Sequence, residues 1–315
     1  MKILFVTATR IGDAVLSTGL LGHLADAHPR ARFTIACGAP AASLFAAFPA
    51  ADRIIPVTKR AGGLHWLKLW AETAGTSWDM VVDLRGSALA WLLRAGARHV
   101  PRGRDDSLHR VEWLARALNL APPPAPRLWT NAAQREAAAA LMPAPPVLAL
   151  APTANWRGKR WRAENFVALA NRLTAPGGIL PGARIAVFGG PGETAMARGV
   201  IENLPGDRVI DLVGKLDLPL AAACLARCAF FVGNDSGLMH MAAAAGIPTL
   251  GLFGPSRAEH YAPWGRRTAV ARTALPYEAL VGGPGYDHRS ADSLMDSLSV
   301  DSAEREAVEL WRRAA

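Results

Sequence analysis

Short apolar runs alternate along this chain with longer stretches in which hydrophobic residues recur at helical spacing. The first run, residues 3–8, is followed at 14–27 by a stretch whose leucines fall on one face of a helix. Continuous apolar runs of this length are typical of parallel strands that are buried on both faces. Strands that alternate with helices predict a parallel sheet covered by helices on both sides. In the first half of the chain we expect strands at residues 3–8, 32–37, 53–57 and 78–84.

Two proline clusters, at residues 122–126 and 143–146, interrupt this alternation. Proline continues neither a helix nor a central strand, so the clusters mark a joint between domains. We predict two similar α/β domains that face a cleft, residues 1–142 and 143–315. The last expected helix, 302–311, lies beyond the second sheet, from where it can pack back on the first domain. The strands expected in the second half are 147–151, 184–188, 208–213 and 229–232.

The composition is that of a packed globular protein, with 51% hydrophobic and 19% charged residues. The three cysteines make no even disulfide framework, which fits a reducing compartment. Cys224 and Cys228 lie four residues apart in a helical stretch without a neighbouring histidine, so buried thiols are favoured over a metal site. The N-terminal apolar run is too short for a signal peptide, and glycines and a proline interrupt the longest uncharged stretch, 237–256. We expect a cytoplasmic protein without a membrane span.

The net charge of +9 and the isoelectric point near 10.2 indicate an anionic partner. Nucleic acid, an anionic membrane surface and a phosphorylated substrate all fit this charge. The sequence has no helix packed with Lys and Arg, no aromatic–basic interleaving of an RNA-binding sheet and no zinc-finger spacing. Nucleic acid is therefore the least supported partner, and we expect none.

Residues 233–240, with the sequence GNDSGLMH, form the most informative motif of the chain. They follow an apolar run and precede an alanine-rich stretch, which predicts a strand, a sharp turn and a helix. Such a turn aims free N–H groups and the positive end of the helix dipole at the crevice where α/β sheets bind ligands. An ordinary capped helix explains Asp235 and Ser236 equally well, but it does not explain His240 in the first helical turn.

Three further positions follow expected strands and carry polar side chains. Asp13 suits either a helix N-cap or a general base, and its spacing alone favours the cap. Lys159 and Arg160, in the loop after the strand at 147–151, form either a solvated basic loop or a phosphate-neutralising site. Glu193 opens a helix after a glycine-rich turn, where it either complements the dipole or binds ribose hydroxyls.

Several motifs are missing from the sequence. No Gly-x-Gly-x-x-Gly follows the first strand, which argues against a nicotinamide-dependent oxidoreductase, and no P-loop is present. There is also no Asp-x-Asp pair and no Gly-x-Ser-x-Gly elbow. A bound phosphate would therefore be held by backbone, Lys and Arg, without a magnesium cluster.

Five segments together resemble glycosyltransferase family 9, the ADP-heptose:lipopolysaccharide heptosyltransferases. They are LFV and RIGDAVL at residues 4–6 and 10–16, KRW at 159–161, GNDSGLMHMAA at 233–243 and FGPS at 253–256. The resemblance implies a GT-B fold, in which two Rossmann-like domains with doubly wound parallel sheets face a cleft. It also implies an inverting transfer of heptose from ADP-heptose to a lipopolysaccharide core acceptor, without cofactor or metal ion.

The resemblance assigns roles to individual residues. Asp13 matches the family's base, and Lys159 matches its phosphate-contacting lysine. Arg10 and Gly12, which precede Asp13 in the sequence, are implied to bind the acceptor. The residues implied to bind the nucleotide sugar are Thr153, Lys159, Arg160, Glu193, Leu216, Asp235, Ser236, Gly237 and His240. The sequence departs from the family in having Arg162 where a proline often follows the tryptophan, and in having no cysteine at 276–297. These departures leave the acceptor and the branch of the family open.

An acceptor of this kind is anionic and linked to lipid, so the resemblance also implies a place at the inner face of the cytoplasmic membrane. Five arginines of the N-terminal half fit such an acceptor, and a solvated basic surface explains them as well: Arg85, Arg94, Arg98, Arg102 and Arg104. The alternative functions are a GT-B transferase that uses another nucleotide sugar and a non-catalytic nucleotide-binding protein.

Overall fold

The computed structural model describes residues 1–101, 103, 105, 107–142, 146–283, 286–287 and 292–314. It consists of two compact units, Met1–Asn131 and Ala132–Ala315. The expected second domain began at Pro143, which lies outside the described residues. The helix before it, α5 (Ala132–Leu141), belongs to the second unit and packs there against α8 (Leu218–Leu225).

The first unit is built on a parallel sheet with the strand order β3-β2-β1-β4-β5. Strand β1 pairs in parallel with both β2 and β4, so the order reverses beside β1 and the sheet is doubly wound. Four of these strands were expected from their apolar runs. The edge strand β5 was not, because its sequence AGARH lacks an apolar run. The strands are β1 (Lys2–Val6), β2 (Arg32–Gly38), β3 (Ala51–Val57), β4 (Trp78–Asp83) and β5 (Ala95–His99).

Helices cover this sheet. The longest, α1 (Ile11–Ala27), begins five residues after β1 ends and buries the predicted leucine face, Leu16, Leu20, Leu21 and Leu24. One core cluster joins the sheet to α2 and α3: Leu4, Val6 and Val81 come from the strands, Leu69 from α2 and Leu89 from α3. The remaining elements are η1 (Ala39–Phe45), η2 (Ala61–Gly63), α2 (Leu64–Thr73), α3 (Leu89–Leu92), α4 (Arg110–Ala115) and η3 (Arg116–Leu118).

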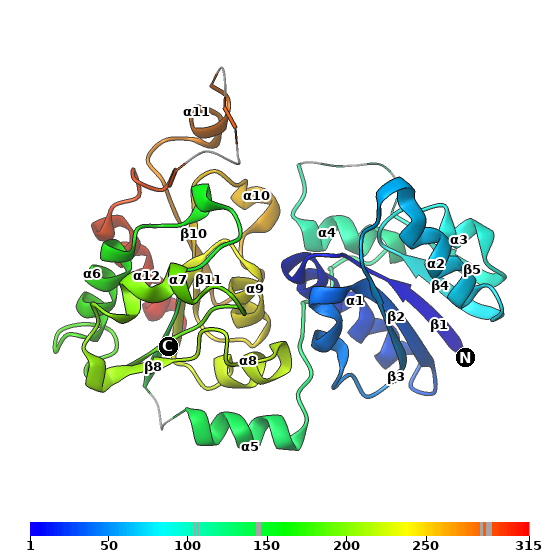
Figure 1. Cartoon of the computed structure of the whole chain (residues 1–315), viewed down its shortest axis with the longest axis horizontal. Coiled ribbons are helices and arrows are strands. Elements are labelled where there is room, and N and C mark those ends of the chain that lie inside the picture. The colour runs from blue at the N-terminus through cyan, green and yellow to red at the C-terminus, as the bar shows by residue number, and fades with distance from the viewer. Residues whose placement is uncertain are drawn as a thin grey trace. The chain divides into compact units, whose positions relative to one another are not determined.

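The second unit contains a parallel sheet with the order β11-β10-β9-β6-β7-β8 (Figure 1). Its strand order reverses between β6 and β9, which are paired neighbours. This is the place where doubly wound sheets bind ligands, at the carboxyl ends of the strands. The strands are β6 (Val147–Ala151), β7 (Arg184–Val187), β8 (Val209–Asp211), β9 (Phe230–Asn234), β10 (Thr249–Phe253) and β11 (Thr268–Arg272).

Two groups of helices pack in the second unit: α6 contacts both α7 and α12, and α9 contacts α8. Helix α12 also packs on β10 and β11, and its Trp311 ring lies 6.2 Å from the Phe230 ring. The last helix therefore packs on the sheet and on α6 of the second unit. The helices not yet placed are α6 (Ala163–Thr174), α7 (Thr194–Ile201), α9 (Gly237–Ala244), α10 (Ala258–Tyr261), α11 (Tyr277–Val281) and α12 (Val300–Ala314).

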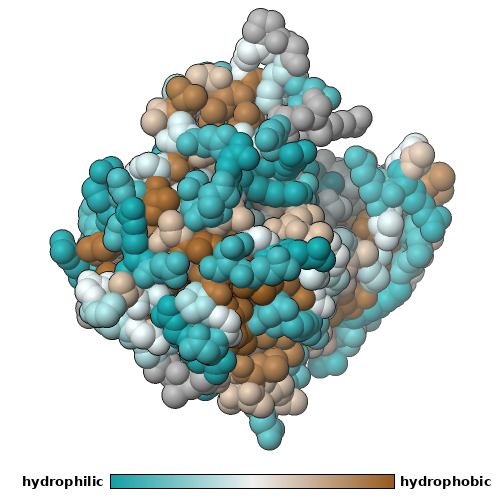
Figure 2. Space-filling view, turned by 60° about the vertical axis from the view of Figure 1, so that its left-hand side comes forward, coloured by the Kyte–Doolittle hydropathy of each residue, from teal (hydrophilic) through white to brown (hydrophobic). Residues whose placement is uncertain are grey.

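Figure 2 brings the second unit forward and shows hydrophilic and hydrophobic residues intermixed over its surface. Within the described ranges, no helix has the length and hydropathy needed to cross a bilayer. Cys224 and Cys228 are buried as expected, and the Cys228 thiol donates to the carbonyl of Cys224 at 3.5 Å.

Candidate functional site

A buried carboxylate, Asp235, lies at the carboxyl end of β9 between two basic side chains. Its Oδ2 accepts a hydrogen bond from Lys159 Nζ at 2.5 Å, and its Oδ1 lies 3.9 Å from His240 Nε2. Asp235 and His240 are both buried, whereas 22% of the Lys159 side chain is exposed. The predicted motif and the predicted basic loop therefore meet at one edge of the sheet, and Lys159 is the member of the cluster whose side chain stays partly exposed.

Helix α9 starts in this cluster, with Ser236 at its N-cap position. The Ser236 side chain makes no cap hydrogen bond, and its Oγ is buried without a partner among the described residues. The first N–H groups of a helix also lack partners inside the helix. An unsatisfied hydroxyl and a positive helix end thus lie beside Lys159, which is an arrangement suited to an anion.

Asn234, the last residue of β9, holds the basic loop in place. Its Oδ1 accepts from the backbone N–H of Trp161 at 3.1 Å, and its Nδ2 donates to the carbonyl of Pro152 at 2.8 Å. Both ends of the loop that carries Lys159 are therefore fixed to β9. Trp161 is buried, and its indole donates to the carbonyl of Leu298 at 2.9 Å. Asn234 has no predicted role, although a polar side chain at the end of a buried strand was a signal that could have indicated one.

Thr153 and Glu193 form a second pair at the same edge. The Thr153 hydroxyl donates to Glu193 Oε2 at 2.6 Å, and the Gly190 N–H donates to the same oxygen at 2.6 Å. Glu193 is the N-cap residue of α7, although its side chain does not bond to that helix. A Cβ on Gly189 would lie 2.9 Å from a Val213 methyl, so glycine is needed for this close packing.

Leu216 lies half-buried in the turn between β8 and α8. This turn is tied to the Thr153–Glu193 pair, because the N–H of Gly214 donates to the carbonyl of Gly189 at 3.0 Å. Leu216 is therefore in an element next to the pair, where its side chain can offer an apolar surface.

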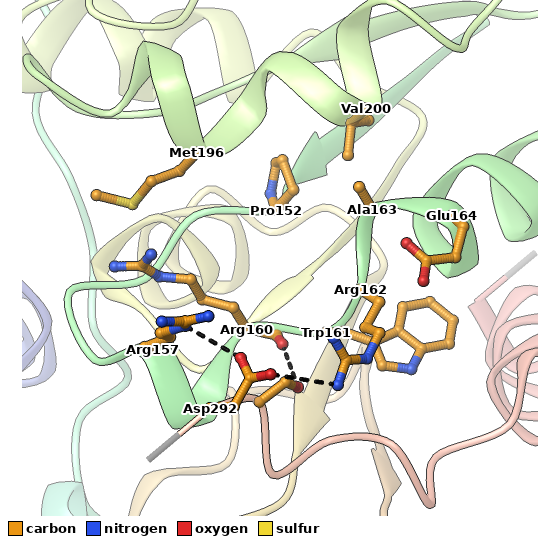
Figure 3. Close-up of a pocket in the computed structure, with 11 residues that line it drawn as sticks. Pro152, Arg157, Arg160, Trp161, Arg162, Ala163, Glu164, Met196, Val200 and Asp292 are labelled. Carbon is orange, nitrogen blue, oxygen red and sulfur yellow. Dashed lines mark hydrogen bonds and ion pairs between the residues drawn. The ribbon is translucent and has the colours of Figure 1, made fainter. Parts of the chain in front are cut away.

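Arg160 adjoins a cavity on the second unit (Figure 3). Its Nε donates to the carbonyl of Ala154 at 2.7 Å, and burial lowers the pKa of its guanidinium although Glu193 raises it. Met196 lies across the cavity from the arginines in Figure 3, and Asp292 pairs with Arg157 and Arg162. The residues that line the cavity are Pro152, Arg157, Arg160, Trp161, Arg162, Ala163, Glu164, Met196, Val200, Asp292 and Ser293. Arg160 is thus the one predicted binding residue among them.

Asp13 lies in the first turn of α1, in the first unit. The N-cap residue of α1 is Arg10, so the interpretation of Asp13 as the N-cap was wrong. Asp13 Oδ1 lies 3.9 Å from Arg110 Nε, and the Arg110 guanidinium stacks on the Trp113 ring at 4.2 Å. His109 fixes the start of α4 by a capping box. No sequence signal indicated Arg110, which approaches Asp13 only because α4 packs on α1.

The predicted arginine surface of the first unit is corrected at one position. All three nitrogens of the Arg98 guanidinium donate to backbone carbonyls, those of Ala90, Leu93 and Ala95, at 2.7–3.0 Å. Arg98 therefore holds the connection between α3 and β5 and is not available to an acceptor. Arg85 and Arg94 are exposed, and Arg102 and Arg104 lie outside the described residues.

Asp83, at the end of β4, is a buried residue that sequence reasoning missed. Its carboxylate accepts from the N–H groups of Arg85 and Ser87 at 2.9 and 3.0 Å and from the Ser87 hydroxyl at 2.5 Å. Burial nevertheless raises the pKa of this carboxyl group, against these hydrogen bonds. Asp83 thereby shapes the loop that follows β4.

Arg10, Gly12 and Asp13 thus lie in the first unit, and the predicted nucleotide-sugar residues all lie in the second. Lys159, Asp235, Ser236 and His240 gather at the β9–α9 turn, and Thr153 with Glu193 forms the neighbouring pair. In the described part of the chain, no three His, Cys, Asp or Glu side chains gather as metal ligands do.

Curated relatives of this chain are heptosyltransferases. Lipooligosaccharide heptosyltransferase 2 of Haemophilus influenzae is 31% identical over 42% of this chain and 38% of its own length. Lipopolysaccharide heptosyltransferase 2 of Salmonella typhimurium is 24% identical over 90% of this chain and 91% of that protein. Lipopolysaccharide heptosyltransferase 1 of Pseudomonas aeruginosa is 27% identical over 84% and 82%, respectively.

Solved structures share the fold over nearly the whole chain. A family 9 glycosyltransferase from Veillonella parvula has a TM-score of 0.79 and 22% identity, covering 99% of this chain and 97% of that one. ADP-heptose lps heptosyltransferase II of E. coli has a TM-score of 0.77 and 20% identity, with 99% of both chains covered. The E. coli heptosyltransferase WaaC with ADP has a TM-score of 0.71 and 20% identity, with 98% and 100% covered.

The sequence profile of glycosyltransferase family 9 (heptosyltransferase) matches residues 84–281, from the end of β4 to α11. This match confirms the resemblance that the motifs indicated, and the two doubly wound sheets confirm the expected fold class. The chain belongs to glycosyltransferase family 9 and is a heptosyltransferase-type glycosyltransferase with the GT-B fold.

Proposed function

We propose that this protein transfers a heptose from ADP-heptose to a lipopolysaccharide core acceptor, with inversion at the anomeric carbon and without a metal ion. Two observations support the donor and acceptor classes: the relatives are lipopolysaccharide heptosyltransferases, and a heptosyltransferase of the same fold has been solved with ADP. The observation that carries the proposal is the cluster of Lys159, Asp235, Ser236 and His240 at the start of α9.

The diphosphate of the donor binds at the N-terminus of α9. Lys159 supplies a positive charge that Asp235 holds in place, and the Ser236 hydroxyl supplies a hydrogen-bond donor. Gly237, without a side chain, lets the phosphate approach the backbone. Glu193 binds the ribose hydroxyls, and Leu216 packs beside the adenine; the hydrogen bond from Thr153 holds the Glu193 carboxylate.

Asp13 acts as the general base in the transfer. It takes the proton of the acceptor hydroxyl while the oxygen attacks the anomeric carbon from the face opposite ADP. The new bond joins the acceptor oxygen to the anomeric carbon, and the bond between that carbon and the phosphate oxygen breaks with its electron pair leaving on ADP. Lys159 and the α9 N-terminus stabilise the negative charge that develops on ADP. They take the role that a metal ion has in enzymes that hold a diphosphate with one.

The acceptor is an anionic lipid-linked saccharide, so the protein works in the cytoplasm beside the inner face of the cytoplasmic membrane. Arg10 and Gly12 flank the base on the acceptor side. The exposed Arg85 and Arg94 meet the negative groups of the acceptor. An anionic acceptor also agrees with the net charge of the whole chain, +9.

The test is calorimetric titration with ADP, GDP and UDP in excess EDTA, followed by incubation with ADP-heptose and a heptose-free core acceptor. We expect selective binding of ADP and an acceptor product heavier by one heptose in mass spectrometry. Selective binding of UDP or GDP would show that the donor is a UDP-sugar or a GDP-sugar and not ADP-heptose. Binding of ADP without any transfer would indicate a nucleotide-binding protein, and no binding at all would overturn the donor site.

A further inference from the structure

The first unit exposes large hydrophobic side chains on two neighbouring helices. Of the eight large hydrophobic residues that are exposed in the described part of the chain, five lie on α2 and α3, with 39% to 66% of their surface in contact with solvent. Soluble proteins rarely gather such side chains without a function for them. The five residues, which we call the α2–α3 patch, are Leu64, Leu67, Trp70, Trp91 and Leu92.

The patch spans two helices that contact each other, α2 and α3 (Figure 1). The Trp70 indole links them, because its Nε1 donates to the carbonyl of Leu92 at 3.4 Å. Core packing does not require the patch, because the opposite faces of the helices supply Leu69, Leu89 and Ala90 to the core. The patch is therefore hydrophobic surface in excess of what holds the first unit together.

Positive charge accompanies the patch. Residues 57–71 and 84–98, which include it, contain no aspartate or glutamate. The nearest carboxylates in sequence are Glu72, which pairs with Arg53 at 2.5 Å and with Lys68 at 3.8 Å, and Asp83, which is buried. The exposed basic residues of the two segments are Lys59, Arg60, Lys68, Arg85 and Arg94.

We propose that the α2–α3 patch docks on a bilayer surface that contains anionic phospholipid. Tryptophan and leucine side chains enter the interfacial region of a bilayer, and Lys and Arg beside them attract its phosphates. A second copy of the chain is a poorer occupant, because a two-fold contact would place the same basic residues against each other. The inference deepens the proposed function, on which it rests for the lipid-linked nature of the acceptor.

The test is flotation of the purified protein with vesicles of phosphatidylglycerol and phosphatidylethanolamine, compared with pure phosphatidylcholine. We expect binding to the anionic vesicles. Salt at about 0.5 M should weaken this binding, because it shortens the Debye length to a few ångström and screens the charges. The double variant Leu67→Ser/Trp91→Ser should lower the bound fraction at least about tenfold. The matched control is Leu141→Ser/Leu275→Ser, which removes exposed apolar residues outside the patch and should leave binding unchanged.

A second pair of variants tests the charges. Lys59→Gln/Arg60→Gln/Lys68→Gln should reduce binding to anionic vesicles about tenfold or more, since each basic residue near an anionic surface contributes to attraction. Arg184→Gln/Arg312→Gln/Arg313→Gln removes three exposed charges of the second unit and should bind as the unchanged protein does. Circular dichroism and ADP titration check that each variant remains folded.

Three outcomes would overturn the inference: no binding of the unchanged protein to anionic vesicles, equal loss in the patch variants and their controls, or a dimer in sedimentation velocity that Leu67→Ser/Trp91→Ser dissolves. The last outcome would make a second copy the occupant. Vesicle binding is measured without nucleotide or acceptor, so a failure of the proposed transfer activity leaves this test intact, and the converse also holds.

Discussion

Lys159 and Asp235 are 76 residues apart in the chain, yet the lysine Nζ lies 2.5 Å from the aspartate Oδ2. Asp235 is almost completely buried, so the lysine compensates a carboxylate that solvent does not reach. The lysine side chain is also partly exposed beside the start of α9. It therefore neutralises the buried carboxylate and leaves a basic side chain beside the helix N-terminus.

Replacement of this lysine should cost both stability and nucleotide affinity. In Lys159→Met we expect ADP to bind about 10- to 100-fold more weakly, as for the loss of a charged hydrogen bond. The melting temperature should also fall, because Asp235 is left buried without its partner. Calorimetry and thermal unfolding measure the two effects.

Two further variants separate these effects. The double variant Lys159→Met/Asp235→Asn should regain much of the stability but none of the affinity. Arg198→Met, which removes an exposed charge on α7, should change neither quantity. Wild-type ADP affinity in Lys159→Met would contradict the assigned phosphate contact.

The base proposed at Asp13 predicts a loss confined to turnover. Asp13→Asn should lower the transfer rate about 10²- to 10⁴-fold, since the amide cannot accept the proton. Its ADP affinity should stay within about twofold of the unchanged protein, because the donor residues lie in the other unit. Asp26→Asn on the same helix, an exposed partner of Arg127, is the control. A variant that keeps more than about a tenth of the rate would rule out this role.

The hydrogen bond between Thr153 and Glu193 should appear as coupling in a double-mutant cycle. Thr153→Val, Glu193→Gln and the double variant are compared by urea unfolding, with an expected interaction of about 0.5–3 kcal/mol. Glu193→Gln should in addition reduce the preference for ADP over its 2′,3′-dideoxy analogue. Strictly additive effects together with an unchanged preference would refute both the pairing and the ribose contact.

Asn234 should affect both the stability of the protein and its affinity for ADP, although we assign it no contact with the nucleotide. Asn234→Ala removes the partners of the Trp161 N–H and the Pro152 carbonyl, and an unsatisfied buried group costs about 1–3 kcal/mol. Urea unfolding should show a loss of that order, and ADP affinity should fall because the loop with Lys159 is released. Asn203→Ala, whose amide bonds only to the carbonyl of Gly199 on the surface, should leave both unchanged.

The cysteine thiols should be unreactive in the folded protein. Burial raises the pKa of Cys224 to about 11 and of Cys37 to about 12, and it also raises the pKa of Cys228. Because these values exceed the unfolded value of about 8.5, the thiols favour folding at lower pH, and their contribution is lost as the pH rises above about 8.5. Absorbance labelling with a disulfide reagent at pH 8 should report three thiols only after urea is added; rapid labelling of native protein would contradict their burial.

The sequence predicted most of the fold correctly, because parallel strands that are buried on both faces appear in the sequence as continuous apolar runs. Apolar runs indicated the central strands, while the edge strand β5 escaped because its residues are half-exposed and need no such run. Asp13 was interpreted as an N-cap because the helix was expected to start at Ala14, whereas α1 starts at Ile11 and its N-cap residue is Arg10. Arg98 was interpreted as a surface charge, because the residues next to it in sequence do not indicate that its guanidinium donates to three backbone carbonyls.

By itself, the sequence determined the alternation of strands and helices, the presence of two α/β halves and the turn at residues 233–240. These features are local, since periodicity and turn residues act over a few positions along the chain. Only the tertiary structure decided that Asp235 binds Lys159, that Asn234 fixes both ends of the basic loop and that α2 and α3 leave one apolar face uncovered. Those relationships depend on the order in which strands pair, which joins distant segments through contacts that no short stretch of sequence encodes.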